Sequence, residues 1–157
     1  MNFKISDIKD VYTVKKPWGY EKWIADGEPN FKYVLKEIFF RSPFRTSLQF
    51  HKFKEETNYI QKGRGILFYS DEVVNVDRFE KGLYSKEEID DLILGLKKIE
   101  LSPGKIFHIK KGHIHRIESI EDLTIIESSS VEVDDVFRIQ DDTNRDHGRI
   151  KNEHSLN

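Results

Sequence analysis

The stretch Ser47-Leu48-Gln49-Phe50-His51, followed by Glu56 and then by Gly63, decides the fold of this chain. A second stretch, Gly112-His113-Ile114-His115-Arg116, comes further along. Together they supply an amide oxygen, two imidazoles and a carboxylate, which suit one divalent metal ion. Because both stretches look like strands, they indicate a small β-barrel with its chemistry inside.

Composition limits the possible function classes. The chain has 157 residues, enough for one domain with a real core, and it has no cysteine. Disulfides and thiolate metal sites are therefore excluded. Charged residues make up 34% of the chain, but they nearly cancel to a net charge of −2. This balance lacks the basic footprint of a nucleic-acid-binding protein.

The N-terminal residues, Met1-Asn2-Phe3-Lys4-Ile5-Ser6-Asp7, lack the apolar run of a signal peptide. No segment has the length and hydrophobicity of a membrane span. We therefore expect a soluble, cytoplasmic protein with neither a membrane nor a nucleic acid as partner.

Strand signals dominate the chain. Alternating or β-branched and aromatic runs occur at 31–41, 64–70, 73–79, 96–101, 105–109, 123–127 and 136–140. Gly and Pro turn signals separate them, such as Ser102-Pro103-Gly104 and Lys111-Gly112. Many short strands with such turns predict an all-β barrel or sandwich. We expect a single domain over 1–146 and a flexible polar tail over 147–157.

One segment has a helical period. Ser85 and Glu88 have the spacing of a capping box, and Gly95 is suited to end a helix. The apolar residues recur at helical spacing: Ile89, Leu92, Ile93 and Leu96. We predict a short inserted helix around 85–95 that packs on the outside of the barrel. Covering the core is the favoured role, and a lid is the alternative.

The first stretch, Ser47-Leu48-Gln49-x-His51-x-x-Lys54-x-Glu56 with Gly63, resembles the first metal motif of the cupins. More closely, it resembles the cupin domain of type II mannose-6-phosphate isomerases, which are often fused to mannose-1-phosphate guanylyltransferases. Pro17-Trp18-Gly19 and the run from Asp134 to Asp141 match further motifs of that domain. The resemblance spans roughly residues 15 to 145. It implies a single cupin barrel, which is a double-stranded β-helix or jelly roll.

The resemblance also implies a metal site. The matching positions are Gln49, His51, Glu56 and His115. Gln49 and His51 are two apart, so on a strand both point to the same face. The ligands suit one divalent ion, with zinc preferred and manganese, iron, cobalt or nickel as alternatives. Each histidine alone would be read as an ordinary polar residue on a sheet, but the set and its spacing favour a metal.

The implied activity is isomerisation between mannose 6-phosphate and fructose 6-phosphate, so the expected partner is a small sugar phosphate. In such chemistry the metal binds the oxygens on C1 and C2, and a base carries a proton between these carbons. The candidates for proton transfer are Glu56, His108, His113 and Glu118. The candidates for contacting substrate, chiefly its phosphate, are Arg45, Lys54, Arg116 and Arg138.

Departures from the family pattern leave the substrate open. Lys54 stands where the family has Arg, Asn58 replaces a Trp and Ser119 replaces an Asn. One alternative is another metallocupin that acts on a related sugar phosphate or nucleotide sugar. Another is a non-catalytic sugar-binding cupin. We also expect a homodimer, to which the apolar run Val34 to Phe40 could contribute through edge-strand pairing.

Overall fold

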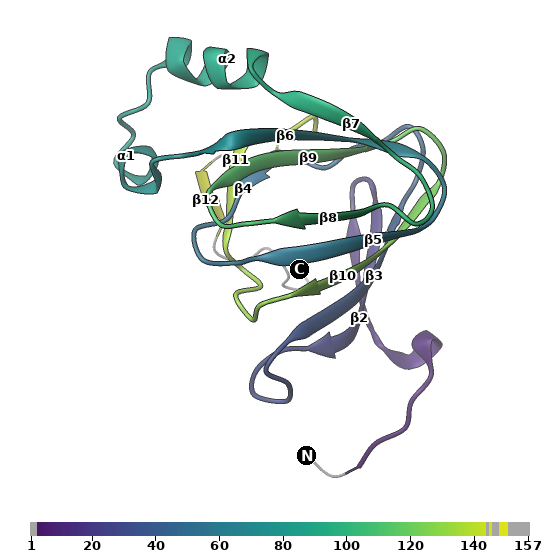
Figure 1. The fold of residues 1–157 in the computed structure, drawn as a ribbon. Helices are drawn as coiled ribbons and strands as arrows, with labels where there is room; N and C mark the ends of the chain where they lie inside the picture. The colour runs from purple at the N-terminus through teal and green to yellow at the C-terminus, as the bar shows by residue number, and fades with distance from the viewer. Residues whose placement is uncertain (1–2, 144, 146–147, 151–157) are drawn as a thin grey trace.

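The computed structural model describes residues 3–143, 145 and 148–150. Two six-stranded antiparallel sheets form the body of the protein (Figure 1). The first sheet runs in the order β1 (Tyr12–Lys16), β2 (Gly19–Asp26), β3 (Val34–Phe40), β10 (Leu123–Ser129), β5 (Glu56–Lys62), β8 (Ile106–Ile109). The second runs in the order β12 (Gly148–Ile150), β11 (Val136–Gln140), β4 (Leu48–Phe50), β9 (His113–Ser119), β6 (Gly65–Val73), β7 (Lys97–Leu101). The predicted all-β jelly roll is confirmed.

The inner core cluster lies between the two sheets. It is formed by inward-pointing residues at alternate strand positions, together with Trp18: Trp18, Ile38, Phe40, Ile60, Leu67, Leu101, Ile117, Leu123 and Ile125. Trp18 stacks on Phe40 with 4.3 Å between ring centroids. These residues close one part of the barrel interior and leave the polar positions of the same strands facing a cavity.

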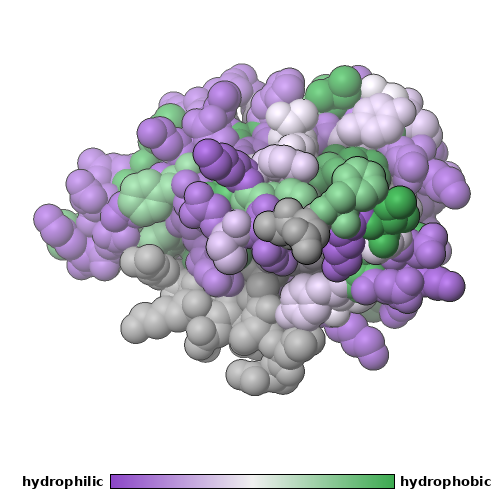
Figure 2. All heavy atoms as spheres, turned by 90° about the horizontal axis from the view of Figure 1, so that it is seen from below, coloured by the Kyte–Doolittle hydropathy of each residue, from purple (hydrophilic) through white to green (hydrophobic). Residues whose placement is uncertain are grey.

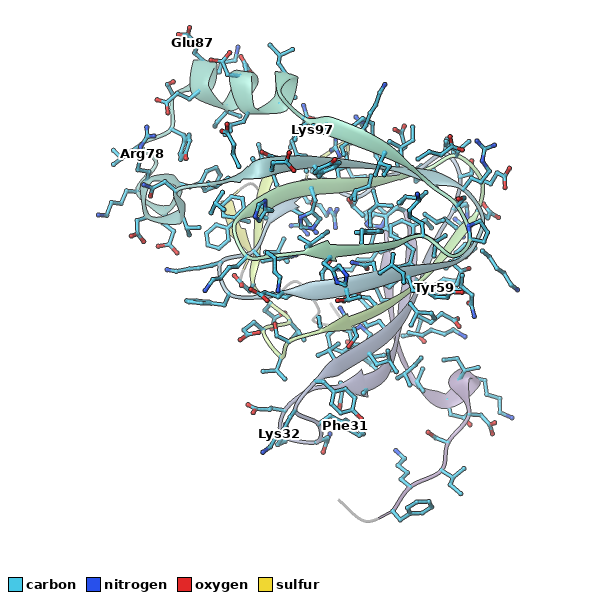
Figure 3. The ribbon with its side chains drawn as sticks, in the orientation of Figure 1. Phe31, Lys32, Tyr59, Arg78, Glu87 and Lys97 are labelled. Carbon is cyan, nitrogen blue, oxygen red and sulfur yellow. The ribbon has the colours of Figure 1, made fainter. Side chains whose placement is uncertain are left out.

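An outer core cluster lies on the opposite face of the second sheet. Its buried members are Leu48, Phe50, Val74, Ile114, Phe137 and Ile139. Two short helices, α1 (Val76–Glu80) and α2 (Lys86–Leu94), cover this cluster and project from the barrel beside β6 (Figure 1). Glu87 on α2 points away from the barrel (Figure 3). The inserted helix therefore covers core, as expected.

The ends of α2 agree with the sequence analysis. The side chain of Ser85 accepts a hydrogen bond from the backbone N–H of Glu88, and Gly95 is the C-terminal cap. The strand expected over 73–79 is wrong, because β6 ends at Val73 and α1 begins at Val76. There Asn75 caps α1 by accepting a hydrogen bond from the N–H of Arg78.

Two further expectations concern the edges of the molecule. The run Val34–Phe40 is β3, which pairs with β2 on one side and β10 on the other, so it offers no free edge for a dimer. The homodimer itself stays a prediction. Residues 148–150, expected in the tail, form β12 and pair with β11. The rest of the expected tail, 147 and 151–157, lies outside the described residues.

The surface agrees with the charged composition. The face seen from below the view of Figure 1 is mostly hydrophilic, with scattered hydrophobic side chains (Figure 2). Among the described residues, no helix combines the length and apolar character needed to cross a membrane.

Candidate metal centre

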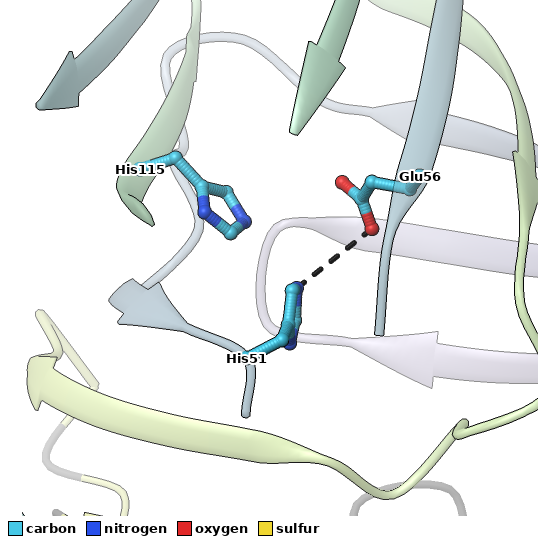
Figure 4. Close-up of side chains that lie close together, drawn as sticks. All are labelled: His51, Glu56 and His115. Atoms are coloured by element: carbon cyan, nitrogen blue, oxygen red, sulfur yellow. Dashed lines mark ion pairs between the residues drawn. The ribbon is translucent and has the colours of Figure 1, made fainter. Parts of the chain in front are cut away.

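Three predicted ligands gather inside the barrel. His51 follows β4, Glu56 begins β5 and His115 lies on β9. One potential ligand atom from each lies within 4.8 Å of the other two. All three side chains are buried, and they surround a common space (Figure 4). Two imidazoles and a carboxylate at this spacing could bind one metal ion.

The orientation of His51 is fixed by Asp135, in the loop before β11. The ring Nδ1–H of His51 donates to the Asp135 carbonyl oxygen at 2.6 Å. The Asp135 carboxylate accepts hydrogen bonds from the backbone N–H groups of Lys52, Phe53 and Lys54, at 3.1, 2.5 and 2.9 Å. The turn that carries His51 is therefore held at four points. This arrangement aims Nε2 into the cavity, as in known metal-binding histidines.

Nε2 of His51 is a buried nitrogen without a hydrogen-bond partner among the described residues. It lies 3.7 Å from Oε2 of Glu56. A buried polar atom without a partner is costly, and a functional role is a common explanation for one. The position therefore fits a ligand atom directed at a metal ion.

His115 is oriented in a similar way. Its Nδ1–H donates to the backbone carbonyl of His113 at 3.0 Å, which leaves Nε2 available. The two sequence stretches are also tied directly, because the N–H of Gly112 donates to the carbonyl of His51 at 2.6 Å. Gly112 has φ +79°, and a Cβ there would lie 2.6 Å from Cγ1 of Val73. The tie between the stretches therefore needs glycine.

The charge states of the cluster suit a metal. Burial, with the nearby charge of Lys54, lowers the pKa of His51 to about 3. Burial also lowers the pKa of His115. The pKa of Glu56 is lowered by Lys54 and the histidines, although burial opposes this change. At neutral pH the cluster therefore has neutral imidazoles and a carboxylate, the forms that bind metal.

Gln49, the fourth expected ligand, also lines the cavity. It lies opposite His115 in the β4–β9 pair, so the two side chains share a face. The amide oxygen of Gln49 accepts a hydrogen bond from the Ser47 hydroxyl at 2.9 Å. Its role as a ligand stays a prediction.

A chain of buried charges extends from the cluster. Nζ of Lys54 lies 2.8 Å from Oε2 of Glu56 and 3.5 Å from Oε2 of Glu127. A second buried lysine, Lys36, lies 3.9 Å from Glu127 and 3.5 Å from Glu21. Lys54 thus contacts the same carboxylate oxygen of Glu56 that faces His51. Its ammonium group therefore occupies part of the space in which a metal ion would contact this oxygen.

Burial, and then the charge of Glu56, raises the pKa of Glu127 to about 7. The pKa of Lys54 is raised by Glu127 and Glu56 against the opposing effect of burial. The cavity therefore holds a permanent cation beside a carboxyl group that exchanges its proton near neutral pH.

Comparison with known proteins identifies the fold. No family model and no curated protein matches the chain. Among solved structures, the capsular polysaccharide assembling protein CapF from Staphylococcus aureus matches with TM-score 0.62 and 13% identity, covering 89% of this chain and 33% of that one. KdgF from Halomonas sp. matches with TM-score 0.59 and 15% identity, covering 85% and 97%. The chain has the cupin fold.

Oxalate decarboxylase from Bacillus subtilis is a further match, with TM-score 0.62, 13% identity, and coverage of 88% of this chain and 33% of that one. The chain thus spans about a third of CapF and of oxalate decarboxylase, but nearly all of KdgF. Identities of 13–15% show a shared fold, and activity stays a proposal. The resemblance to mannose-6-phosphate isomerases likewise stays a hypothesis.

The cupin barrel separates the expected proton-transfer residues. Glu56 lies in the central cavity, whose volume is about 60 Å³. His108 and His113 line a neighbouring groove. Glu118 is on the opposite face of β9 from His115 and lines neither space. Of the four, Glu56 is therefore the one placed in the cavity.

Two of the expected substrate-binding cations are close to the cluster. Lys54 lines the cavity directly. Arg138 is buried and lies opposite Gln49 in the β4–β11 pair, so it is on the cavity side of the second sheet. It is not among the residues that line the cavity.

The other two cations are held elsewhere. Arg45 pairs with the Asp142 carboxylate at the surface. Arg116 is next to His115 on β9 and points to the other face, where its Nε donates to the carbonyl of Thr46 at 2.8 Å. Neither lines the cavity, so their roles in binding stay predictions that this placement does not favour.

The sequence analysis missed Glu21, Lys36 and Glu127, which all line the cavity. A signal was present, because Lys36 is at an inward position of β3 between apolar inward neighbours, Val34 and Ile38. A charged residue at an inward position of an otherwise apolar strand is costly to bury and so marks a candidate site.

Proposed function

We propose that this cupin is a metal-dependent sugar-phosphate isomerase that interconverts mannose 6-phosphate and fructose 6-phosphate. The cluster of His51, Glu56 and His115, with ligand atoms within 4.8 Å, carries the proposal. The sequence resemblance suggests the substrate. The cavity adds the polar groups that proton transfer next to a carbonyl requires.

The residues of the cluster fit the metal that this reaction needs. The hydrogen bonds of His51 and His115 fix both rings with Nε2 available, and Glu56 is ionised at neutral pH. A divalent ion held there supplies Lewis acidity toward oxygens on neighbouring substrate carbons. The chain's own task is to place these ligands and to exclude water around them.

The proton transfer is assigned to Glu127. Aldose–ketose exchange takes a proton from one carbon and returns one to its neighbour, so the group must accept and donate at the same pH. A carboxyl group with a pKa of about 7 does both near neutral pH. Lys54, 3.5 Å away, stabilises negative charge as it develops on the substrate.

The test is a coupled assay for fructose 6-phosphate with protein stripped of metal and reloaded with zinc, manganese, iron, cobalt or nickel. We expect metal-dependent turnover that is lost in Glu56→Gln and kept in Glu100→Gln, a matched change at an exposed site. Glu127→Gln should lower kcat about 100-fold or more and leave metal affinity within a fewfold. Bound metal without turnover would show that the proposed substrate is wrong.

A second candidate is another metal-dependent cupin reaction on a related sugar phosphate or nucleotide sugar. The observation in its favour is Asn58, which donates to Oε1 of Glu56 at 3.2 Å and stands where the isomerase family has Trp. Lys54, which stands where the family has Arg, also contacts Glu56. Two residues that contact this proposed metal ligand therefore differ from the family. Turnover of a different sugar phosphate in the same metal series would favour this candidate.

A further inference from the structure

A groove opens between β8 and the β6–β9 pair, beside the metal cluster. Its volume is about 350 Å³, against about 60 Å³ for the central cavity. His115 lines both spaces, so the groove adjoins one ligand of the cluster. We propose that this groove binds the ring of a phosphorylated sugar, with the phosphate beside Lys110. This inference rests on the proposed function and adds the location at which the substrate binds.

The groove is large enough for a sugar phosphate. Small-molecule sites in proteins measure about 300–1,000 Å³. The groove falls in this range, whereas the central cavity has room for an ion and a few small groups. Only the reacting end of a sugar phosphate can therefore enter the cavity, and the rest of the molecule must lie outside it. The space that shares His115 is the groove.

The groove walls suit a sugar ring. Tyr69 lies opposite His115 in the β6–β9 pair, and Phe107 comes from β8 on the other sheet. Both are half-buried and pack against the inner core cluster, which holds them in place. Aromatic and apolar walls with a few polar groups are typical of ligand sites.

Polar groups surround these aromatic walls. The Nδ1–H of His113 donates to the Ser70 carbonyl at 2.9 Å, which leaves its Nε2 available to a ligand. Nδ1 of His108 contacts the Thr57 hydroxyl at 2.8 Å on the outer face of the first sheet, because the neighbouring residues Phe107 and Glu56 face inward. The groove thus offers the oriented imidazole of His113 to the hydroxyl and phosphate oxygens of a sugar phosphate.

Lys110 supplies positive charge. It pairs with Glu55 at 3.0 Å, but both side chains are exposed, so the pair is weak and Lys110 is free to turn to a phosphate. The groove also contains Asp71, a carboxylate that would repel an anion. Asp71 pairs with Lys97, which reduces this repulsion.

The competing route reaches the cavity from the other end of the first sheet. Lys16 on β1 lines the cavity, and β1 and β8 are at opposite ends of that sheet. A substrate that entered there would contact Lys16 instead of Phe107 and Lys110. The two routes therefore predict opposite results for matched substitutions.

The experiment is calorimetric titration of zinc-loaded protein with mannose 6-phosphate, glucose 6-phosphate and mannose 1-phosphate. Phe107→Ala and Lys110→Gln should each weaken binding about tenfold or more. Lys111→Gln, a change at the exposed neighbour of Lys110, and Lys16→Gln should stay within about twofold. Zinc affinity and melting temperature, measured for every variant, exclude loss of the metal or of the fold. Lys110→Gln keeps the test valid if Phe107→Ala is unstable.

The outcomes separate the groove from the proposed function. If mannose 6-phosphate is bound and turned over, and Lys16→Gln weakens it while Phe107→Ala and Lys110→Gln do not, the groove is wrong and the function stands. If another of these sugars binds with the predicted losses but mannose 6-phosphate is not turned over, the groove stands and the function is wrong. If none of the three binds, both are overturned.

Discussion

The two faces of strands β4 and β9 carry different chemistry. On the inner face, Gln49 and His115 face the cavity. On the outer face, Phe50 and Ile114 belong to the outer core cluster beneath the helices. Neighbouring residues of the same strands therefore serve opposite purposes, because successive side chains of a strand point to opposite faces.

The energetics of the two faces are also opposite. Burying charged groups such as Glu56 and Lys54 costs free energy that their mutual attraction only partly returns. Burying apolar surface stabilises the fold by about 25 cal/mol per Å². We infer that the outer cluster under α1 and α2 supports the strands that hold the costly inner site. Four predictions test this division.

The largest effect is expected on the outer face. Phe50 is fully buried and its ring centroid lies 5.0 Å from those of Phe79 and Phe137. Phe50→Ala should lower the free energy of unfolding by about 3–5 kcal/mol, measured by urea denaturation with chelator present. Phe53→Ala, at a side chain that is 56% exposed, should change it by less than about 1 kcal/mol. Equal effects of the two changes would contradict the outer cluster's role.

On the inner face, His51→Ala should weaken zinc binding at least about 100-fold, because it removes one ligand of the cluster. Calorimetry or competition with a chelator measures this affinity. His108→Ala is the matched control and should stay within about threefold, since the His108 side chain contacts Thr57 on the outer face of the first sheet. Unchanged affinity in His51→Ala would mean that the metal binds elsewhere.

The pH dependence of stability should become steeper in Glu127→Gln. The depressed pKa values of His51 and His115 give stability that is present above about pH 6.5 and is lost as the pH falls. The raised pKa of Glu127 acts in the opposite sense, since its contribution is fully present below about pH 4 and is lost as the pH rises through about 7.

Without the Glu127 carboxyl group, nothing at this position offsets the stability that the two histidines lose as the pH falls. Between pH 7 and pH 5, metal-free Glu127→Gln should lose about 2 kcal/mol more stability than the unmodified protein. Urea denaturation at pH 5, 6 and 7 measures the difference. Parallel curves for the two proteins would contradict a raised pKa at Glu127.

The smallest effect concerns Lys54. Its ammonium contacts the carboxylate oxygen of Glu56 that faces His51, so it repels and competes with a metal ion. Lys54→Met should tighten zinc binding about tenfold, whereas Lys52→Met, at a partly exposed side chain paired with Glu80, should not. Weaker binding in Lys54→Met would show that the lysine organises the ligands instead of competing with the metal.

Much of the fold was accessible from sequence because strand alternation and turn residues are local signals. The cap at Ser85 and the end at Gly95 located α2 for the same reason. The five-residue helix α1 was misread as a strand, since Val76 and Phe79 also suit strands and one helical turn is too short to show a period.

The ligand set was readable from spacing, but its surroundings depend on tertiary structure. Alternation could have excluded Arg116, the neighbour of His115, from the inner face. No local signal placed Asp135 against His51, because that contact joins the loop before β11 to the residue that follows β4. The groove walls come from separate sheets, so Tyr69 and Phe107 could not be paired from sequence either.

The hydrogen bonds that Asp135 accepts from His51 and from the turn after it also have a consequence for biosynthesis. The ligands lie at 51, 56 and 115, and the residue that orients the first of them is at 135. A chain emerging from the ribosome therefore lacks an oriented His51 until β11 has been made and the sheets have closed. Metal should be captured after synthesis, by the folded barrel, and a fragment ending before Asp135 should bind it poorly even with every ligand present.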